Sequence, residues 1–413
     1  MRKCTGTAYD KEHCQVEKLG CPGCHHFKKE ENTVSRKLAS VQRIKMIKPI
    51  EGADRIEIVQ VLNWNCVAKK GEFRVGQKVL YFEIDSLLPD IPEFEWLRGS
   101  SWSQKLNKYK ISTHKFRNQI SQGLVVPVDK LKTIYKQLMY GQVLEESPRL
   151  IPYPEEILNP SEGDDLTELL QIEKYDPPVS NGPLGDLIHH EWYVPKTDEE
   201  RIQVCAQNVL PEYICADDDD WYASIKLDGC SCTAGLFDDA FLIGGRNQWY
   251  KDENMYTTTV KKYGDLQKRL EYYKAVNGLY VVFQGELCGP GIQSNKLGLP
   301  EKEWFIFNVF VSKTGENGSY VKCDKLRMLK LCEEFHLKTV PIIEDSKKFN
   351  FNMTHDIDET VDNLLKYVDG IKYRDYFGDA SPNQIAEGVV FRKDDMTNSF
   401  KVVSNKYLLK GGE

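Results

Sequence analysis

The first half of the chain carries its hydrophobic residues in runs of strand length. Such runs, alternating with polar residues or continuous, occupy residues 55–62, 66–68, 78–84 and 123–127. Glycine, proline and asparagine residues separate them, as expected where strands are joined by tight turns. Many short strands between about 36 and 150 predict a small antiparallel barrel, and an OB-fold is the most economical barrel of this size. The alternative is a generic barrel that only braces the rest of the protein.

From residue 221 onward, strand patterns alternate with helical patterns. The strands are predicted at 222–226, 231–237, 241–244, 279–288, 304–311, 388–392 and 400–403, and the helices near 256–275, 323–334 and 359–368. This order predicts an α+β domain with antiparallel sheets. The connector before it, residues 151–220, is rich in proline and acidic residues and is expected to be an irregular linker. Within it, Thr197 or Asp198 is a candidate N-cap for a helix.

Four parts are therefore expected: a cap (1–35), an OB-fold domain (36–150), a linker (151–220) and an α+β domain (221–413). A chain of 413 residues with 41% hydrophobic residues exceeds the usual size of one core, which agrees with two domains. No apolar run approaches the roughly 18 residues of a membrane span, and the N-terminus lacks the apolar segment of a secretory signal. We expect a soluble monomer in the cytoplasm, with the nucleus as the alternative.

The net charge of −7 argues against a protein that coats nucleic acid through bulk charge. Any contact with nucleic acid must then be local. The most basic local segment is 105–117, in which lysine, arginine and histidine surround Tyr109 and Phe116. It fits a surface that follows phosphates, or equally an exposed strand that keeps the protein soluble.

Four of the 12 cysteines gather at the N-terminus. They are Cys4, Cys14, Cys21 and Cys24, and two histidines follow directly. Thiolates and imidazoles in one short segment suit a tetrahedral structural zinc ion. A redox Cys-x-x-Cys pair, an iron–sulfur cluster and an unstructured reactive tail are the alternatives. The other eight cysteines are scattered and are interpreted as reduced core thiols.

The candidate chemistry centres on Lys226-Leu-Asp-Gly229, the arrangement in which enzymes that store AMP or GMP on a lysine present their nucleophile. Further matches follow in order at 245–247, 283–286, 304–308, 387–390 and 400–403. Each match alone has an ordinary explanation, such as a surface turn, a hairpin residue, a core phenylalanine or a structural ion pair. Their common order favours a single site.

The residue types suit transfer of a nucleotide. A lysine attacks as a free amine, but its ordinary pKa is about 10.4, so nearby positive charge from Lys401 and a metal ion is expected to lower it. Asp228, Glu286 and Glu387 supply the hard oxygens that Mg²⁺ or Mn²⁺ prefers, directly or through water. Two phenylalanines at 305 and 307 share one strand face and could stack on a purine, with Val390 covering its other face.

With these motifs, the chain resembles the covalent nucleotidyltransferase superfamily of ATP-dependent ligases and capping enzymes. It is most similar to the RNA ligases that carry an N-terminal OB domain, to which 119–123 and 195–201 also correspond. The resemblance covers about 36–410 and implies an ATP-grasp-like ligase domain and a role in RNA repair. It implies three steps: Lys226 takes AMP from ATP, AMP passes to a 5′-phosphate end, and a 3′-hydroxyl displaces AMP.

The resemblance also implies a role for each residue. Lys226 would be the adenylated nucleophile and Asp228 would hold metal-bound water. Arg246 would contact the ribose or the end phosphate, and Glu286 the ribose hydroxyls. Phe307 and Val390 would contact adenine. Glu387 would orient metal and amine, and Lys401 would contact the α-phosphate.

Two positions depart from the family pattern. Val403 stands where many RNA ligases have a second lysine, for which Lys406 is the candidate substitute, and Asn308 stands where an aspartate is common. A capping guanylyltransferase is the first rival, although a C-terminal barrel would be expected after the last motif. A non-catalytic nucleic-acid binding protein is the second. The resemblance favours RNA with 5′-phosphate and 3′-hydroxyl ends as partner, in nicked duplexes with RNA on the 3′-hydroxyl side.

Overall fold

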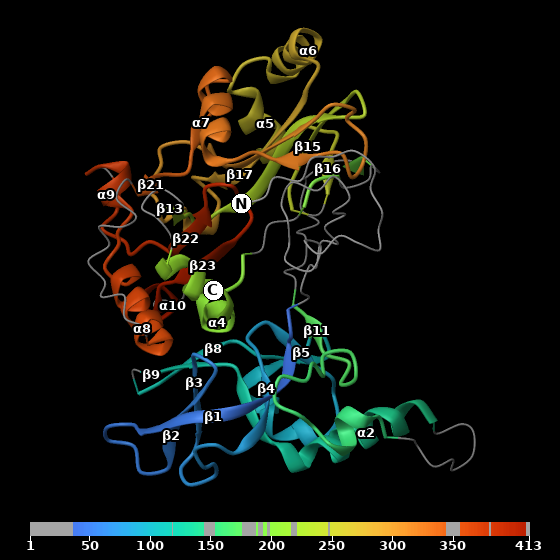
Figure 1. The fold of residues 1–413 in the computed structure, drawn as a ribbon, viewed down its shortest axis with the longest axis vertical. Coiled ribbons are helices and arrows are strands. Elements are labelled where there is room, and N and C mark those ends of the chain that lie inside the picture. The colour runs from blue at the N-terminus through green and yellow to red at the C-terminus, as the bar shows by residue number, and fades with distance from the viewer. Residues whose placement is uncertain are drawn as a thin grey trace, which may run out of the picture. The chain divides into compact units, whose positions relative to one another are not determined.

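The computed structural model describes residues 36–117, 119–143, 153–175, 187–188, 193–195, 199–215, 221–246, 248–343, 356–379 and 381–409 (Figure 1). Two compact units divide the chain at Arg36, and every other described residue belongs to the second. The four N-terminal cysteines predicted to bind zinc lie outside the described residues. So do Thr197 and Asp198, the predicted N-cap residues.

The first domain is built on a five-stranded antiparallel sheet. Its order is β10 (Leu124–Pro127), β4 (Lys78–Phe82), β1 (Ala39–Pro49), β2 (Ile56–Val61) and β3 (Trp64–Lys69). The long strand β1 pairs with β4 through its first half and with β2 through its second half, and a bulge separates the halves between Ile44 and Met46. Bulges bend a strand and increase its twist, which lets one strand serve two sides of a barrel. The predicted antiparallel barrel is confirmed.

Smaller elements complete this domain. A second sheet has the order β11 (Glu173–Lys174), β5 (Ser86–Leu88), β7 (Lys108–Lys110) and β6 (Trp102–Ser103), and β8 (Thr113–Phe116) forms a hairpin with β9 (Gln119–Gln122). The helical segments are η2 (Pro92–Leu97), α1 (Arg98–Ser101), η3 (Val128–Lys130), α2 (Leu131–Val143) and α3 (Glu155–Leu158). They bury Phe94, Tyr109 and Ile134 in one core with Leu80 and Phe82 of β4.

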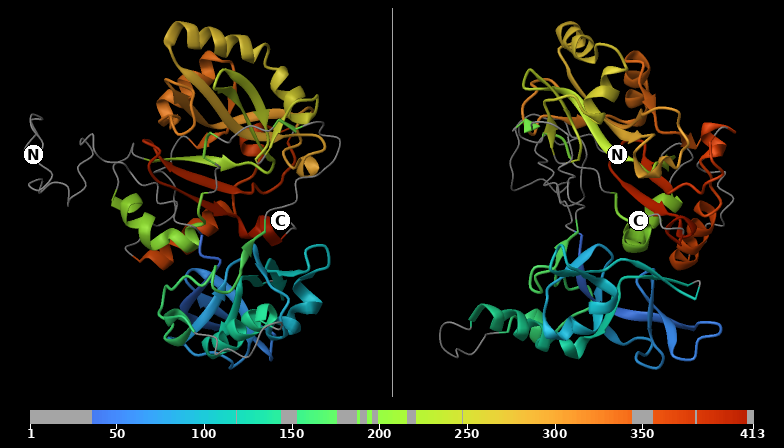
Figure 2. Two further views of the ribbon diagram at one scale, coloured as in Figure 1. Left: turned by 90° about the vertical axis from the view of Figure 1, so that its right-hand side faces the viewer. Right: turned by 180° about the vertical axis from the view of Figure 1, so that it is seen from behind.

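Two further sheets form the second domain (Figure 2). The larger contains β12 (Leu187–Ile188), β16 (Trp249–Tyr250), β15 (Ala240–Gly244), β14 (Cys230–Phe237), β17 (Tyr280–Cys288), β18 (Glu303–Ser312) and β19 (Val321–Lys322), with β20 (Lys338–Thr339) beside β18. The smaller contains β21 (Ile342–Ile343), β13 (Trp221–Lys226), β22 (Gly388–Lys393) and β23 (Ser399–Val403). Every pair is antiparallel except β18 with β20, so the predicted α+β class is confirmed.

Helices pack against both sheets. Those on the larger sheet are α5 (Met255–Lys261), α6 (Leu266–Asn277) and α7 (Lys325–Glu334), and those on the smaller are α4 (Ile202–Cys215) and α8 (Ile357–Val368) (Figure 1). Three short segments, η4 (Gln293–Asn295), α9 (Arg374–Phe377) and α10 (Asn405–Leu409), complete the domain. One core lies under each sheet.

One predicted helix is wrong. The sequence pattern predicted a single helix over 256–275, whereas the structure has α5 and α6 with a break between them. Gly264 adopts a left-handed backbone conformation (φ +82°) at the break. Asp265 then caps α6, since its side chain accepts a hydrogen bond of 3.1 Å from the Lys268 backbone. Hydrophobic periodicity continues across such a break, so periodicity alone does not detect it.

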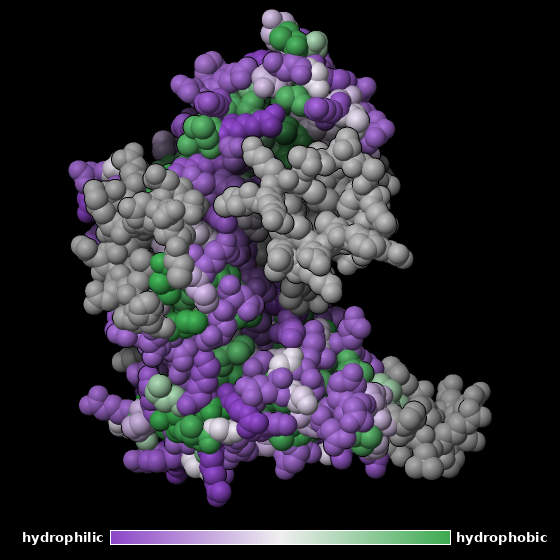
Figure 3. Space-filling view, in the orientation of Figure 1, coloured by the Kyte–Doolittle hydropathy of each residue, from purple (hydrophilic) through white to green (hydrophobic). Residues whose placement is uncertain are grey.

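The described surface is mainly hydrophilic on the face shown in Figure 3, where apolar residues form small separate groups. Among the described residues, no helix is long and apolar enough to cross a membrane. The cysteines whose side chains are described, from Cys66 to Cys332, are free thiols, and all except Cys230 are buried. Burial raises the pKa of Cys66, Cys205 and Cys332, as expected for unreactive core thiols.

Candidate active site

Lys226 stands at the end of a buried strand. The residues of β13 before it are fully buried, while the Lys226 side chain is 27% exposed. Its Nζ donates a hydrogen bond of 2.6 Å to Oε1 of Glu387. Glu387 directly precedes β22, whose first residue Gly388 lies opposite Lys226. A side chain at Gly388 would meet the Val402 carbonyl oxygen at 2.2 Å, so the Glu-Gly pair is needed where β22 and β23 approach closely.

The turn after Lys226 brings two more carboxylates to this point. A Cβ at Gly229 would lie 2.4 Å from the Leu287 carbonyl oxygen of β17, so only glycine lets the turn approach that strand. Leu287 follows Glu286, and the Gly229 backbone hydrogen-bonds the Glu286 carboxylate. The structure therefore brings Asp228, Glu286 and Glu387 around Lys226, from three places far apart in the sequence.

A buried tyrosine connects two of these segments. The Tyr373 hydroxyl accepts hydrogen bonds of 3.1 Å from the backbone N–H groups of Asp228 and of Glu387. The same hydroxyl donates a bond of 3.3 Å to the Lys226 carbonyl oxygen. Tyr373 has no exposed surface, so water does not replace these bonds. Its hydroxyl fixes the relative positions of the candidate nucleophile and two carboxylates.

A second lysine also reaches the site. Nζ of Lys296 lies 2.8 Å from Oδ2 of Asp228 and donates a hydrogen bond of 2.8 Å to the hydroxyl of Tyr407. Tyr407 belongs to α10, directly after β23, and is buried. The sequence analysis identified neither residue.

The electrostatics of Lys226 differ from the sequence-based expectation. Burial alone would lower the pKa of Lys226, but the Glu387 and Glu286 carboxylates outweigh burial and raise it above its ordinary value. Lys226 is therefore an ammonium, and a bound cation has to offset the nearby carboxylates before the amine attacks. Burial, with Glu387 and Asp228 nearby, raises the pKa of Glu286 to about 8 against the attraction of Lys226. The role of Glu286 as a metal ligand stays a prediction.

The smaller sheet presents a nucleotide-sized row of residues beside Lys226. Val390 lies opposite both Ser224 and Lys401, so these three side chains share one face with Lys226. Val390 is buried and Lys401 is half-buried. The backbone N–H of Lys401 donates a hydrogen bond of 2.8 Å to the Glu200 carbonyl oxygen, which fixes β23 to the start of α4.

Of the two phenylalanines predicted to stack on a purine, only Phe307 has a partly exposed side chain. Phe305 is a core residue, with its ring centre 5.5 Å from that of Phe377. Phe307 is half-buried, and the Arg392 guanidinium lies 5.9 Å from its ring centre. Arg392 also donates hydrogen bonds of 3.0 Å to Oγ of Ser224 and 2.8 Å to Oε1 of Glu199. A buried, paired arginine thus lies between the row of β22 and Phe307.

The remaining predicted positions lie at the edge of the site or beyond it. Arg246 is exposed just after β15, and its contact with the ribose or the end phosphate stays a prediction. Val403 is buried opposite Gly388, so it has no polar role. Lys406 is exposed on α10.

The donor set fits a divalent cation that is held together with a substrate. Among the residues that the structure describes, no three His, Cys, Asp or Glu side chains form a ready-made metal cage. Asp228 and Glu387 instead offer carboxylate oxygens close to the nucleophile, and each is paired with a lysine. Mg²⁺ characteristically binds one or two carboxylates and completes its shell with waters and substrate phosphates.

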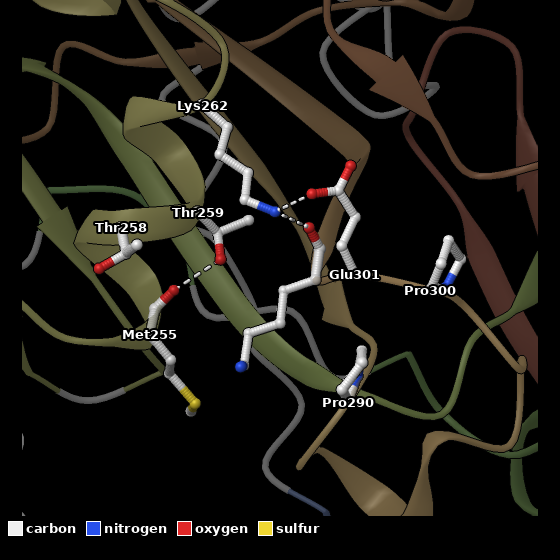
Figure 4. A pocket seen from close by; sticks show the side chains of 8 residues that line it. Met255, Thr258, Thr259, Lys262, Pro290, Pro300 and Glu301 are labelled. Carbon is white, nitrogen blue, oxygen red and sulfur yellow. Dashed lines mark hydrogen bonds and ion pairs between the residues drawn. The ribbon is translucent and has the colours of Figure 1, made fainter.

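A separate hollow lies elsewhere on the second domain. A cavity of about 510 Å³ opens between α5 and the segments around Pro290 and Pro300 (Figure 4). None of the residues around Lys226 lines it. Lys262 at its edge pairs with Glu301, as the dashed lines in Figure 4 show. The nucleotide-binding features described above are therefore independent of this cavity.

Comparison with known proteins agrees with this geometry. Residues 219–408 match the RNA ligase family, and residues 38–128 match an OB-fold domain family. Residues 219–408 belong to the RNA ligase family. No curated protein matches it significantly.

Solved structures of an RNA ligase from Naegleria gruberi extend the similarity over nearly the whole chain. The complex with pyrophosphate is 27% identical, with a TM-score of 0.68, and the match covers 91% of this chain and 99% of the other. A glutamate-to-alanine variant with ATP and manganese is 27% identical (TM-score 0.69; 92% and 100% covered). A further variant with AMP and manganese is 28% identical (TM-score 0.67; 91% and 99% covered). The similarity therefore extends over both the barrel domain and the ligase domain of the present chain.

Proposed function

We propose that this RNA ligase uses ATP and a divalent cation to join a 5′-phosphate to a 3′-hydroxyl through AMP bound covalently to Lys226. The observation that carries the proposal is the pairing of Lys226 with Glu387 at 2.6 Å, where two other carboxylates converge. The likeness to a ligase whose solved structures contain ATP and manganese, or AMP and manganese, supports the choice of nucleotide and metal.

In the first step, Nζ of Lys226 forms a bond to the α-phosphorus of ATP while the bond to the departing pyrophosphate breaks. Lys226 starts as an ammonium, so it must first lose a proton to a neighbouring carboxylate or to water. Asp228 and Glu387 would hold the divalent cation, which supplies positive charge to lower the pKa of Lys226 and to polarise the α-phosphate. Lys401, on the same face, would contact the α-phosphate as its negative charge develops.

The other residues bind and orient the nucleotide. Phe307 and Val390 would enclose the adenine, and Glu286 would contact the ribose hydroxyls. A carboxyl whose pKa is raised to about 8 carries a proton at neutral pH and can donate as well as accept a hydrogen bond. Arg246 would contact the ribose or the end phosphate. AMP would then pass to the RNA 5′-phosphate, and attack by the 3′-hydroxyl would release it.

The test is incubation of the purified protein with ATP labelled on the α-phosphate and Mg²⁺ or Mn²⁺, followed by denaturing electrophoresis. Protein stripped of bound AMP with pyrophosphate should become labelled. Lys226→Ala should lose the label completely, because no other side chain replaces the nucleophile. GTP run in parallel separates a ligase from a capping enzyme. A labelled Lys226→Ala band, or preferential labelling by GTP, would reject the proposal.

We further propose that the substrate is a nicked duplex with RNA on the 3′-hydroxyl side. Sealing of matched nicks with RNA or DNA at that terminus measures this preference. Equal sealing of both nicks would contradict it. Binding of a structural zinc ion by Cys4, Cys14, Cys21 and Cys24 stays a prediction from their spacing.

A further inference from the structure

The segment that carries Lys296 has an unusual backbone. Gln293, Ser294 and Asn295 all adopt left-handed conformations, with φ of 42°, 58° and 48°. L-residues rarely do so in succession, because Cβ crowds the following carbonyl oxygen. Side-chain hydrogen bonds hold the turn: Nδ2 of Asn295 donates to the Leu299 carbonyl oxygen at 2.9 Å, and its Oδ1 accepts from the Leu299 N–H at 3.1 Å.

The turn delivers Lys296 to two fixed partners. Its Nζ lies 2.8 Å from Oδ2 of Asp228 and 2.8 Å from the Tyr407 hydroxyl, which accepts its hydrogen bond. Both charged side chains are shielded, with 23% of Lys296 and 10% of Asp228 exposed. Tyr407 is itself buried in α10. An ion pair built in this way keeps its position better than a surface pair.

The position of the ammonium group is informative. Lys296 neutralises the same carboxylate that the proposed function assigns to the divalent cation, and Lys226 does so at Glu387. Each of these two carboxylates is thus balanced by one lysine ammonium group. A metal ion that approaches Asp228 has to compete with Lys296, because two cations cannot share one carboxylate closely without mutual repulsion.

We infer that Lys296 is a positioning residue that holds the place of the divalent cation at Asp228 and gives up that carboxylate when the metal binds. The inference rests on the proposed function, which assigns the metal to Asp228. The hydroxyl of Tyr407 keeps the displaced ammonium beside the site, where it faces the phosphate oxygens brought by the nucleotide. Each of the two carboxylates is therefore paired with one lysine, and the divalent cation adds further positive charge beside them.

Direct binding of Mn²⁺ tests the inference without any turnover. Free Mn²⁺ is measured by electron paramagnetic resonance during titration of the full chain without nucleotide. Lys296→Met removes the charge at nearly constant length and should tighten binding about three- to tenfold, since a competing cation is lost. Lys296→Arg keeps the charge and should bind Mn²⁺ like the parent. Lys262→Met, which removes a lysine at the cavity of Figure 4, is the matched control and should change nothing.

Asp228→Asn separates this inference from the function on which it rests. It should weaken Mn²⁺ binding about tenfold or more, because a charged metal ligand is lost. If Asp228→Asn weakens binding but Lys296→Met leaves it unchanged or weaker, the inference about Lys296 is wrong and the metal assignment stands. If Asp228→Asn has no effect, the metal assignment itself fails.

Discussion

Two arginine–glutamate pairs of almost equal length show how differently the two domains use charge. Arg392 and Glu199 lie 2.8 Å apart in the ligase domain, and their side chains are 4% and 13% exposed. Arg43 and Glu162 lie 2.7 Å apart in the barrel domain, and theirs are 46% and 50% exposed. Distance alone would rank the pairs as equivalent. The surroundings make them different interactions.

In the buried pair, the surroundings shift the pKa of the glutamate. Burial alone would raise the pKa of Glu199, but Arg392 and Lys322 lower it to about 2. Neither Arg392 nor Glu199 can turn to water if its partner is removed. An exposed pair loses little, because water replaces the missing partner. The Arg392–Glu199 pair therefore holds a fixed geometry next to the proposed nucleotide, whereas the Arg43–Glu162 pair lies largely in solvent.

The largest predicted difference follows directly. Arg392→Ala should lower the free energy of unfolding by about 3–5 kcal/mol, because it leaves Glu199 buried without its main partner. Arg43→Ala should lower it by less than about 1 kcal/mol. Urea unfolding followed by circular dichroism measures both. Equal losses would show that burial does not distinguish the two pairs.

The double variant Glu199→Gln with Arg392→Met tests the cost of an unpaired buried charge by removing both charges of the pair. Replacing both members should cost less than the single Arg392→Ala change, because neither member of the pair is left as an unpaired buried charge. A double variant less stable than the single variant would contradict this account.

The sequence predicted the fold because its strongest signals are local. Alternation and short apolar runs predicted β2, β3, β4 and β10 of the barrel and the longer strands of both ligase sheets, whereas β1, the helix α2 and the break at Gly264 were missed. The motif residues were also found locally, since Lys226, Asp228 and Glu387 occur in recognisable short patterns. The glycines of these short patterns also have a structural reason. Gly229 and Gly388 stand where a neighbouring strand leaves no room for a side chain.

The rest of the site could not be predicted, because it depends on contacts between distant segments. Tyr373 is 147 residues from Lys226 in sequence and acts through its hydroxyl on backbone groups, which no residue pattern encodes. Lys296 reaches Asp228 only through a left-handed turn made of residues that are not glycine. Arg392 offered one local signal, a charged residue directly after the apolar run 389–391 of β22.

Lys322 gives a smaller effect that depends on pH. Burial and the nearby Arg392 lower the pKa of Lys322 to about 8, although Glu199 partly compensates. The folded state therefore disfavours the charged form. Stability linked to Lys322 is fully present above its unfolded pKa of about 10.4 and is lost as the pH falls through 8.

Lys322→Met should accordingly raise the free energy of unfolding by about 2 kcal/mol at pH 7, and the gain should shrink as the pH rises from 8 to 10. Parallel urea titrations of parent and variant at several pH values measure it. Lys115→Met, at an exposed position of β8 in the barrel, is the control and should show no such trend. A gain that does not depend on pH would mean that packing, not charge, limits stability at this position.

A further effect, which reaches the chemistry as well as the stability, is expected at Tyr373. Tyr373→Phe keeps the ring and removes the hydroxyl that binds the backbones of Lys226, Asp228 and Glu387. The loss should be about 1–2 kcal/mol, because the bonds are neutral and the cavity left is small. Adenylation should slow about tenfold or more at saturating ATP, with little change in the ATP concentration required, since the nucleophile is misplaced while the base-binding row is intact. Single-turnover labelling measures this rate.

Tyr272→Phe, on the exposed face of α6, is the control and should change neither the stability nor the rate of adenylation. A Tyr373→Phe variant that is less stable but adenylates at the parental rate would make the tyrosine a structural residue only.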